Sequence, residues 1–597
     1  MESGFWTAQS ALLGNQFAID TVSNNIANIN TVGFKSSSTN FADLLYQTTK
    51  AGTASTNPLQ VGLGSQVAAN SLNLSQGSIQ PTSIATNIAL NGNGFFIVQN
   101  GPTSNPNYYF TRAGNFSFDA DNNLVDPSGN FVVGWMASPS SSGTGFTLSQ
   151  DPTTGIPTGP AGIMNISNYQ KVPAVASTYI KMQGNLGPAS SVTQYAQASP
   201  TSDFSILYDS NGNSLNVQPG DNFAISYNGG KTYHVYEYQP SGTAPTDGTE
   251  GFSTIGELIA KMNQDIQSDT STSNSVSFNN GQITITNNGS SDISLKVLPT
   301  SQVPTGSSLS PNAVSKDNTN LNTLMESLNQ LIAPNQSISS STINVDSYTM
   351  QATFYDSIGT KHTLNITFTK SAYNPTNNTT TWDWQASLPN NEATLSNNTG
   401  QIVFDSNGGL DPSTTSPTIN LSSFNNGASN MSLLLNFWNT PNASYSGNQF
   451  TGLTQFGMNS STSSISSDGS ASGILQSVNF DTSGNLIGMY SNGNSYIIGK
   501  VAVAKFTNPQ GLAQIGSNLF QITANTDSPQ VIASKSYIGV AGYGGRGTIS
   551  PSSLEQSNVD LNTQLTNMIM YERAYQANTK SLQTLDQVIQ TAIQLKQ

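Results

Sequence analysis

The sequence contains no cysteine, only two histidines and very few charged residues. Without cysteine the chain forms no disulfide, no thiolate metal site and no cysteine nucleophile. The two histidines, His234 and His362, are too few for a multi-histidine metal centre. Charged residues make up 8% of the chain, against about 25% in an ordinary soluble domain, and Asn, Ser, Thr and Gly take their place. A surface solvated by neutral polar groups suits dense packing against copies of the same chain.

Long apolar runs are also absent. The N-terminus has no basic segment followed by an apolar core, so it does not read as a secretory signal peptide. No run of 18 apolar residues is long enough to span a membrane. The composition is nevertheless typical of an extracellular protein, so we expect export without a cleaved signal. A net charge of -14 and a pI near 4.4 disfavour nucleic acid and anionic membranes as partners.

The chain is long enough for several cores, since it has 597 residues. Its 35% apolar and 9% aromatic content argues against disorder. Both ends carry apolar seams at spacings of three and four, which predicts two long helices. The seam positions are Met1, Phe5, Ala8, Leu12, Asn15, Ile19, Val22, Ile26 and Ile29 at the N-terminus, and Leu561, Leu565, Met568, Tyr571, Tyr575, Asn578, Leu582, Leu585, Ile589 and Ala592 at the C-terminus. A lone seam would face water, so we expect the two ends to pair as a coiled coil; separate docking on a globular core is the alternative.

A thirteen-residue segment follows the first seam. It reads Ser23-Asn24-Asn25-Ile26-Ala27-Asn28-Ile29-Asn30-Thr31-Val32-Gly33-Phe34-Lys35, and Gly33 is expected to stop the helix with a positive φ. Near the other end, Ser557 or Asn558 is expected to cap the last helix, which contains Arg573-Ala574-Tyr575-Gln576-Ala577-Asn578. The two motifs resemble the N- and C-terminal signatures of the flagellar axial protein family, which contains rod, hook and hook-junction subunits.

Between the ends the pattern is typical of strands. Residues 88–98 predict a hairpin around Asn-Gly turns, and strands follow at 109–119 and 131–135. These resemble the first half of a β domain shared by distal rod and hook subunits. Asp119, Asp121 and Asp126 lack the Gly and Glu positions of a calcium loop, so we expect a turn there.

Two segments echo each other. Residues 204–212 and 354–370 open two copies that both predict a strand, an Asp-Ser-x-Gly turn and another alternating strand. The second copy, with Trp382 and Trp384 after it, resembles the outer-domain signature of hook subunits. Between the echoes we expect an inserted α+β module, with one helix through Ile255, Leu258, Ile259, Met262 and Ile266 and another through Leu321, Leu324, Met325, Leu328, Leu331 and Ile332.

The predicted fold class is a mainly β, multidomain chain with terminal helices paired as a coiled coil, nested β domains and a small α+β insertion. The predicted domains are 1-34 with 555-597 (helical), 35-75 (connector), 76-140 with 455-554 (inner β), 141-209 with 346-454 (outer β) and 210-345 (insertion).

The resemblance implies a structural subunit of the bacterial flagellar hook, which assembles into a curved tube that transmits torque. It implies a homopolymer, with the distal rod, hook cap, hook-filament junction proteins and the flagellar export apparatus as partners, and an extracellular location at the hook. It implies that assembly depends on the terminal helices and signatures: Phe5, Leu12, Ile19, Val22, Ile26, Asn28, Thr31, Gly33, Phe34, Lys35, Asn558, Leu561, Leu565, Met568, Arg573, Tyr575, Asn578, Leu582, Leu585 and Ile589.

Three alternatives remain open. A distal rod or other axial subunit is disfavoured by the second β region. An extracellular adhesin could use the insertion. An enzyme is not predicted, because the sequence offers no catalytic triad, paired acid or metal cluster, and His362 lies alone in an expected strand. No cofactor, catalytic residue or metal site is therefore expected.

Overall fold

The computed structural model describes residues 2–101, 107–140, 145–187, 194–240, 249–304, 307–310, 316–374 and 376–594. The chain divides into two compact units. Unit 1 joins Met1–Pro173 to Ser472–Gln597, whereas unit 2 is the continuous segment Ala174–Ala471. The fold is mainly β, with several sheets and with the two terminal helices in contact, which confirms the predicted fold class.

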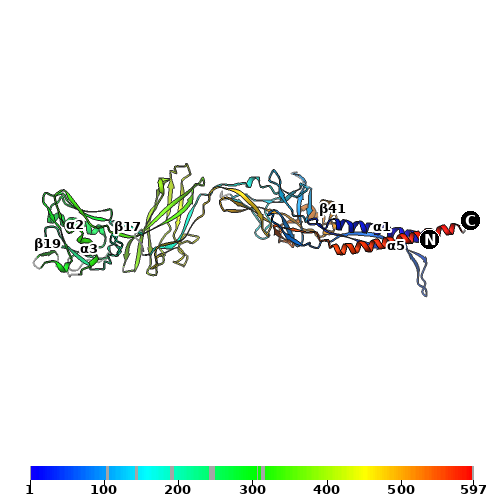
Figure 1. The fold of residues 1–597 in the computed structure, drawn as a ribbon, viewed down its shortest axis with the longest axis horizontal. Coiled ribbons are helices and arrows are strands. Elements are labelled where there is room, and N and C mark those ends of the chain that lie inside the picture. Colours follow the sequence, from blue (N-terminus) through cyan, green and yellow to red (C-terminus); the bar gives the residue numbers. More distant parts are fainter. Residues whose placement is uncertain are drawn as a thin grey trace. The chain divides into compact units, whose positions relative to one another are not determined.

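The terminal helices α1 (Glu2–Ala27) and α5 (Leu561–Gln594) lie side by side (Figure 1). A methyl group placed on Gly4 would lie 3.6 Å from the Leu585 side chain, and Asn25 Nδ2 donates to Gln564 Oε1 at 3.1 Å. Each step along α1 toward its C-terminus is therefore matched by an equal step along α5 toward its N-terminus. The helices are antiparallel and in steady register, as a coiled-coil seam requires. Met1 lies outside the described residues.

The end of α1 and the start of α5 are determined by different kinds of residue. After α1, Gly33 adopts φ +70°, as predicted, and a Cβ there would lie 2.5 Å from Ala113 N. The cap of α5 was predicted wrongly. Asp560 caps it, with Oδ1 accepting from Asn562 N at 3.0 Å and Oδ2 from the Thr563 hydroxyl at 2.7 Å. Asn558 is not available for capping because its amide bonds to the N-terminal arm.

Four strands follow α1. Strand β1 (Ser37–Asp43) pairs with β4 (Ser65–Leu72), and β2 (Tyr46–Lys50) pairs with β3 (Leu59–Gly62). The β1–β4 pair packs against α1, where Thr39 and Thr21 hydroxyls lie 3.2 Å apart. The β2–β3 hairpin extends away from the helix pair and is almost wholly exposed (Figure 1).

The main sheet of unit 1 combines strands from both halves of the chain. For example, β11 pairs with β39, and β7 pairs with β40. Its central path is β15 (Lys171–Val172), β37 (Gly473–Phe480), β38 (Asn485–Tyr490), β39 (Ser495–Val501), β11 (Phe131–Met136), β7 (Phe95–Gln99), β8 (Tyr108–Thr111), β42 (Leu519–Gln521) and β41 (Ala513–Gly516). Attached to it are β9 (Ser117–Phe118), β10 (Leu124–Val125), β14 (Gly162–Ile163), β40 (Val503–Ala504) and β43 (Ile538–Gly539).

Smaller pairs complete unit 1. They are β5 (Ile79–Pro81) with β45 (Ser553–Glu555), β6 (Ile88–Asn91) with β44 (Thr548–Pro551), and β12 (Ser138–Pro139) with β13 (Phe146–Thr147), beside the short helix α4 (Pro529–Ser534). The predicted hairpin over 88–98 is therefore wrong, because β6 pairs with β44 and β7 pairs with β8. Gly94, at φ +127°, turns the chain so closely against Val503 that β7 enters the main sheet beside β40.

Unit 2 contains two sheets that enclose one apolar core with Trp382, Trp384 and Trp438. The first sheet consists of β31 (Thr394–Ser396), β33 (Thr418–Ser422), β34 (Met431–Asn436), β16 (Tyr179–Asn185), β35 (Leu453–Thr454) and β36 (Ser461–Ser467). The second consists of β17 (Tyr195–Gln197), β28 (Asn344–Tyr355), β29 (Lys361–Asn374), β30 (Thr379–Ser387) and β32 (Thr399–Phe404).

A second core in unit 2 lies among residues 198–345. Its strands are β20 (Glu250–Phe252), β19 (Thr232–Tyr238), β18 (Asn222–Ser226), β24 (Lys296–Leu298) and β25 (Ser308–Ser310), then β21 (Ser275–Asn279), β22 (Gln282–Asn287) and β27 (Gln336–Ser339), and the pair β23 (Ile293–Ser294) and β26 (Leu331–Ile332). Helix α2 (Ile255–Asp269) buries the predicted apolar face and begins with a capping box formed by Thr254 and Glu257.

The second predicted helix of this module is shorter than expected. Helix α3 (Thr319–Glu326) ends before Leu331, and Leu331 and Ile332 belong to strand β26 instead. Ile332 pairs with Ile293 of β23 and is 2% exposed. Helical spacing continues past Glu326 in the sequence, but burial of Ile332 in a sheet overrides it.

Aspartates close many of the hairpin turns. Asp356 Oδ1 accepts from Ile358 N at 3.0 Å and from Thr360 N at 2.8 Å. The same i+2 and i+4 pattern occurs at Asp119, Asp126, Asp209, Asp405 and Asp481. The predicted turns at 119–126 and in both echoes are thus present. The first echo, however, begins with a 3-10 helix (Phe204–Ile206) rather than a strand, because Asp203 caps it through Ser205 N.

His362 links three segments in the outer β region. Its Nε2 lies 3.0 Å from Asp356 Oδ2 and its Nδ1 lies 2.6 Å from Glu392 Oε2, while its ring stacks on Phe354. Burial alone would lower the pKa of His362, but the hydrogen bonds to Glu392 and Asp356 outweigh burial and raise it. Burial opposes ionisation of Asp356, yet bonds from His362 and Asn426 lower its pKa to about 2.

We predict that the stability that His362 gives to the outer β region is lost in alkali. Because its folded pKa lies above the unfolded value of about 6.5, its contribution is complete below that value and is lost as pH rises through the folded pKa. His362→Gln should lower stability by roughly 1–3 kcal/mol at pH 6 and should flatten the loss between pH 6 and 9. Calorimetry of the full chain measures both. Lys361→Gln, at an exposed neighbour, is the control; identical pH profiles for wild type and His362→Gln would contradict the prediction.

Candidate assembly interface

A buried group of three charges lies where the terminal arms meet the main sheet of unit 1. Lys35 Nζ lies 2.7 Å from Glu555 Oε1, and Arg112 Nη1 lies 3.2 Å from Glu555 Oε2. The Lys35 and Glu555 side chains are fully buried, and that of Arg112 is 6% exposed. Lys35 comes from the N-terminal arm, which is the segment that follows α1. Glu555 comes from the C-terminal arm, which is the segment that precedes α5, and Arg112 comes from the β domain. One carboxylate therefore joins three distant parts of the sequence.

Backbone groups complete the surroundings of these charges. Glu555 Oε1 accepts from Gly77 N at 2.9 Å, Lys35 donates to Ser75 O at 2.7 Å, and Arg112 donates to Gly92 O at 2.7 Å. Burial lowers the pKa of Lys35 and of Arg112, while attraction to Glu555 opposes that change in both. Glu555 thus compensates both buried cations.

Two asparagines reinforce the same junction. Asn558 Oδ1 accepts from Ser36 N at 2.8 Å, and its Nδ2 donates to Asn73 O at 2.8 Å. Asn25, fully buried, exchanges two hydrogen bonds with the backbone of Ser37 at 2.8 and 3.0 Å. Asn558 was among the predicted assembly residues, whereas Asn25 was quoted only as part of the N-terminal segment.

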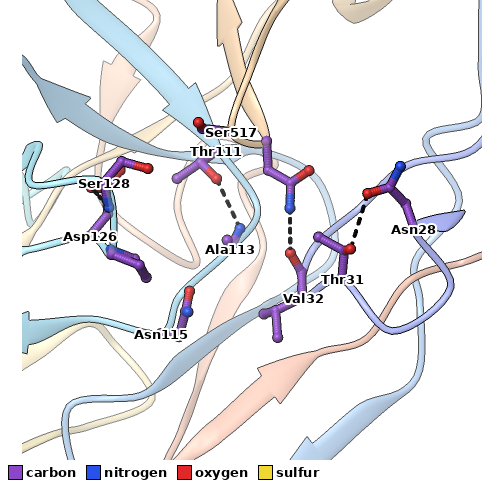
Figure 2. A pocket seen from close by; sticks show the side chains of 11 residues that line it. Asn28, Thr31, Val32, Thr111, Ala113, Asn115, Asp126, Ser128 and Ser517 are labelled. Atoms are coloured by element: carbon purple, nitrogen blue, oxygen red, sulfur yellow. Dashed lines mark hydrogen bonds between the residues drawn. The ribbon is translucent and has the colours of Figure 1, made fainter. Parts of the chain in front are cut away.

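The turn after α1 lies beside a pocket of about 360 Å³, shown in Figure 2. Thr31 Oγ1 donates to Asn28 Oδ1 at 3.1 Å, and Asn518 Nδ2 donates to Val32 O at 2.8 Å. Thr111, Ala113, Asn115, Asp126, Pro127, Ser128 and Ser517 form the rest of the lining. Hydroxyls and amides dominate this lining, so it can exchange hydrogen bonds with another polypeptide but holds no catalytic constellation.

The remaining predicted residues lie along the helix pair or just after α1. Val22, Gly33 and Phe34 are buried. Those that are half-buried are Leu12, Ile19, Ile26, Met568, Asn578, Leu582, Leu585 and Ile589. Arg573 is exposed, and its guanidinium donates to Gln576 Oε1 at 3.3 Å on the same helix. Asn578 Nδ2 donates to Ala574 O at 2.9 Å.

A large apolar area of the helix pair stays in contact with water. No residue in the described part of α5 is buried. The exposed apolar surface of the helix pair consists of Phe5, Trp6, Leu13 and Phe17 on α1 and Leu561, Leu565, Ile569, Met570, Tyr575, Val588 and Ile593 on α5. Trp6 is 60% and Leu13 63% exposed. Exposed apolar side chains repeated along both helices are typical of an interaction surface.

Sequence reasoning missed Glu555 and Arg112. A lysine that closes an otherwise neutral segment signals a need for a carboxylate, but the carboxylate lies 520 positions away. Arg112 likewise has its partner 443 positions away. Nothing in local spacing could identify these pairs.

We predict that Glu555→Gln strongly destabilises unit 1. The change leaves Lys35 and Arg112 buried without a counter-ion, which costs about 3–5 kcal/mol. Glu572→Gln, at an exposed position of α5, should change stability by less than about 0.5 kcal/mol. Urea unfolding of the full-length variants provides both values, and a loss under about 1 kcal/mol for Glu555→Gln would show that the junction does not depend on this carboxylate.

Among the described residues, no helix has both the length and the apolar character needed to cross a membrane. Four family models match along the chain. They are "Flagella basal body rod protein" at residues 5–35, "Flagellar hook protein FlgE/F/G D1 domain" at 89–167, "Flagellar basal body protein FlaE D2 domain" at 327–470 and "Flagellar basal body rod FlgEFG protein C-terminal" at 550–595.

Known proteins match over the whole length. The flagellar hook protein FlgE of Helicobacter pylori strain J99 is 28% identical over 100% of both chains, and that of Borreliella burgdorferi is 25% identical over 100% of both. The crystal structure of Helicobacter pylori flagellar hook protein FlgE2 aligns with a TM-score of 0.51 and 18% identity, covering 80% of this chain and 100% of that one. That structure supports the fold alone. The matched domains and the full-length relatives together show that the chain belongs to the flagellar hook protein FlgE family, a family of structural proteins rather than enzymes.

Proposed function

We propose that this chain polymerises through its terminal helices into the curved tube of the flagellar hook and transmits torque from rod to filament. The observation that carries the proposal is the exposed apolar surface of the helix pair. These side chains are already about half buried, so burying the rest of each would gain about 1 kcal/mol. In the monomer these side chains stay partly exposed, whereas neighbouring copies with the same surface can bury them.

The antiparallel pairing of α1 and α5 supports this arrangement. It gathers both ends of the chain into one element with apolar residues on both helices. The buried charges at Lys35, Arg112 and Glu555 then fix this element to the main sheet of unit 1. A contact made by the helices is therefore mechanically connected to the β domain. In a tube, the helices would hold subunits together while the β domains bear the changing contacts of rotation.

The composition of the chain suits the second role. Charged residues are only 8% of the sequence, so neighbouring domains have few ion pairs to break when they shift, and exposed pairs contribute little in any case. We further propose the distal rod, the hook cap and the hook-filament junction proteins as partners at the ends of the tube. Delivery by the flagellar export apparatus, without a cleaved signal peptide, would place the chain outside the cell.

We predict that the double change Leu565→Ser and Ile569→Ser prevents tube formation while the chain still folds. Both side chains lie on α5, and Ile569 is 58% exposed, so the monomer loses few internal contacts. Ile358→Ser is the matched control, because Ile358 is 57% exposed on unit 2. Electron microscopy and sedimentation of concentrated protein measure assembly. Tubes from the double variant would reject the helix surface as the assembly element, and loss of tubes with Ile358→Ser would assign a share to unit 2.

Trypsin provides a second test on the unmodified chain. We predict that Arg573 and Lys580 are readily cut in dilute monomer, because both are exposed on helix α5. Lys35 and Arg112 should resist cleavage because they are buried. In polymerised protein the sites on α5 should be protected as well. Mass spectrometry of the fragments gives the order of cleavage, and equal rates at Arg573 in monomer and polymer would contradict burial of α5 in the assembly.

A further inference from the structure

A cluster of one histidine and three carboxylates lies in unit 2, between β19, β20 and α2. Ligand atoms of His234, Glu250 and Asp265 lie within 4.8 Å of one another. Asp269 follows Asp265 by one helical turn, and its Oδ2 lies 3.2 Å from His234 Nε2. The cluster lies on the α2 side of the sheet, and its carboxylates come from strand β20 and helix α2, which are also joined by an ion pair between Lys261 and Glu250.

The contacts of His234 differ on its two sides. Nε2 is at hydrogen-bonding distance from Asp269, which also accepts from Asn228 Nδ2 at 3.3 Å. Nδ1 lies 3.5 Å from Asp265 Oδ2, at the outer limit for a hydrogen bond. Because Asp269 occupies the Nε2 side, Nδ1 is the ring nitrogen that can share a cation with Asp265.

That spacing fits a bridging metal ion. Two ligands bound to one tetrahedral Zn²⁺ at about 2.0–2.2 Å lie about 3.4 Å apart. His362 offers an internal comparison, because its two ring nitrogens lie 3.0 and 2.6 Å from carboxylate oxygens, which are ordinary hydrogen bonds. The two histidines of the chain thus stand in similar acidic surroundings but at different distances.

The charges of the cluster also favour a bound metal ion. Glu250, Asp265 and Asp269 carry three negative charges, and Lys261 is the nearby lysine, with Nζ 3.8 Å from Glu250 Oε2. With Lys261 paired to Glu250, a divalent cation can balance the remaining charges of Asp265 and Asp269. The Glu250 and Lys261 side chains are 33% and 35% exposed, so an ion can reach the cluster from solvent.

We infer that His234, Glu250 and Asp265 form a binding site for a divalent transition-metal ion, best suited to Zn²⁺, with a water molecule in the fourth position. An imidazole with carboxylates selects this class of ion over Ca²⁺ and Mg²⁺, which prefer oxygen ligands alone. Asp269 orients the imidazole from behind, as carboxylates commonly do for metal-bound histidine. The Tyr236 hydroxyl, which donates to Asp265 and lies 3.2 Å from the Tyr227 hydroxyl, holds the second carboxylate.

The ion would fasten β19, β20 and α2 to one another. This role is independent of assembly through the terminal helices, because the cluster lies entirely within unit 2. Metal binding would stabilise this module in proportion to the free metal concentration, without changing the family fold.

The test uses tag-free, full-length protein stripped with a chelator and titrated with ZnCl₂ by calorimetry, with zinc content measured after gel filtration. We expect one Zn²⁺ per chain and a higher unfolding temperature for one transition. His234→Asn should weaken binding by about 100-fold or more and Asp269→Asn by about 10–100-fold. Lys261→Met should strengthen binding, because it removes the competing cation.

His362→Gln is the matched control, since it removes the other histidine of the chain and should leave the zinc stoichiometry unchanged. Glu250→Gln, at a partly exposed side chain, covers the case in which His234→Asn fails to fold. The visible spectrum of the Co²⁺-loaded protein reports the ligand geometry directly. Absence of binding, or binding of equal strength in the His234→Asn and Glu250→Gln proteins, would overturn the proposal, and binding lost only with His362→Gln would move the site to the other histidine.

Discussion

The carboxylate of Glu555 is the contact on which the arrangement of unit 1 depends. It compensates two buried cations, one from the N-terminal arm and one from the β domain, and it is itself held by Gly77 N. A buried charge without a partner is among the most destabilising features a fold can contain. The three groups therefore accept very few relative positions, and the arms are fixed where they meet the sheet. The exposed helices beyond that point have a rigid base.

The rarity of charge in this chain makes the position of each charge informative. Six aspartates close hairpin turns by accepting backbone N–H groups, a role that depends on geometry as much as on charge. The Glu555 group and the cluster at His234 use carboxylates to bring separate segments together. Charged residues are only 8% of the sequence, so most of the remaining surface carries neutral side chains. Few ionic contacts thus compete with the apolar surface of the helices when copies of the chain meet.

Local patterns in the sequence predicted much of this structure, and long-range pairing explains most of what they missed. The apolar seams indicated both terminal helices, and the face of α2 was predicted residue by residue. The hairpin at 88–98 failed because β6 takes its partner, β44, from the far end of the chain. Helix α3 was predicted too long because Ile332 satisfies a helical spacing and a strand equally well. The position of Asn558 in the sequence predicts a helix cap, yet its side-chain amide forms hydrogen bonds with Asn73 and Ser36. The Glu555 group was beyond prediction for the same reason, since no spacing relates residues about 500 positions apart.

The connectivity of the two units has a consequence for the order in which they form. Unit 2 is one continuous segment, whereas the main sheet of unit 1 alternates strands from residues 95–172 with strands from 473–539. Its contacts have high sequence separation, and such contacts form slowly because long loops must close first. During synthesis or translocation from the N-terminus, all strands of unit 2 are available while half of the strands in the main sheet of unit 1 are still missing. Glu555 comes later still, so the N-terminal arm gains its anchor only when the chain is nearly complete. The junction and then the pairing of α1 with α5 are thus the last parts of the fold to become possible, and an incomplete chain cannot present a correctly anchored helix pair to its neighbours.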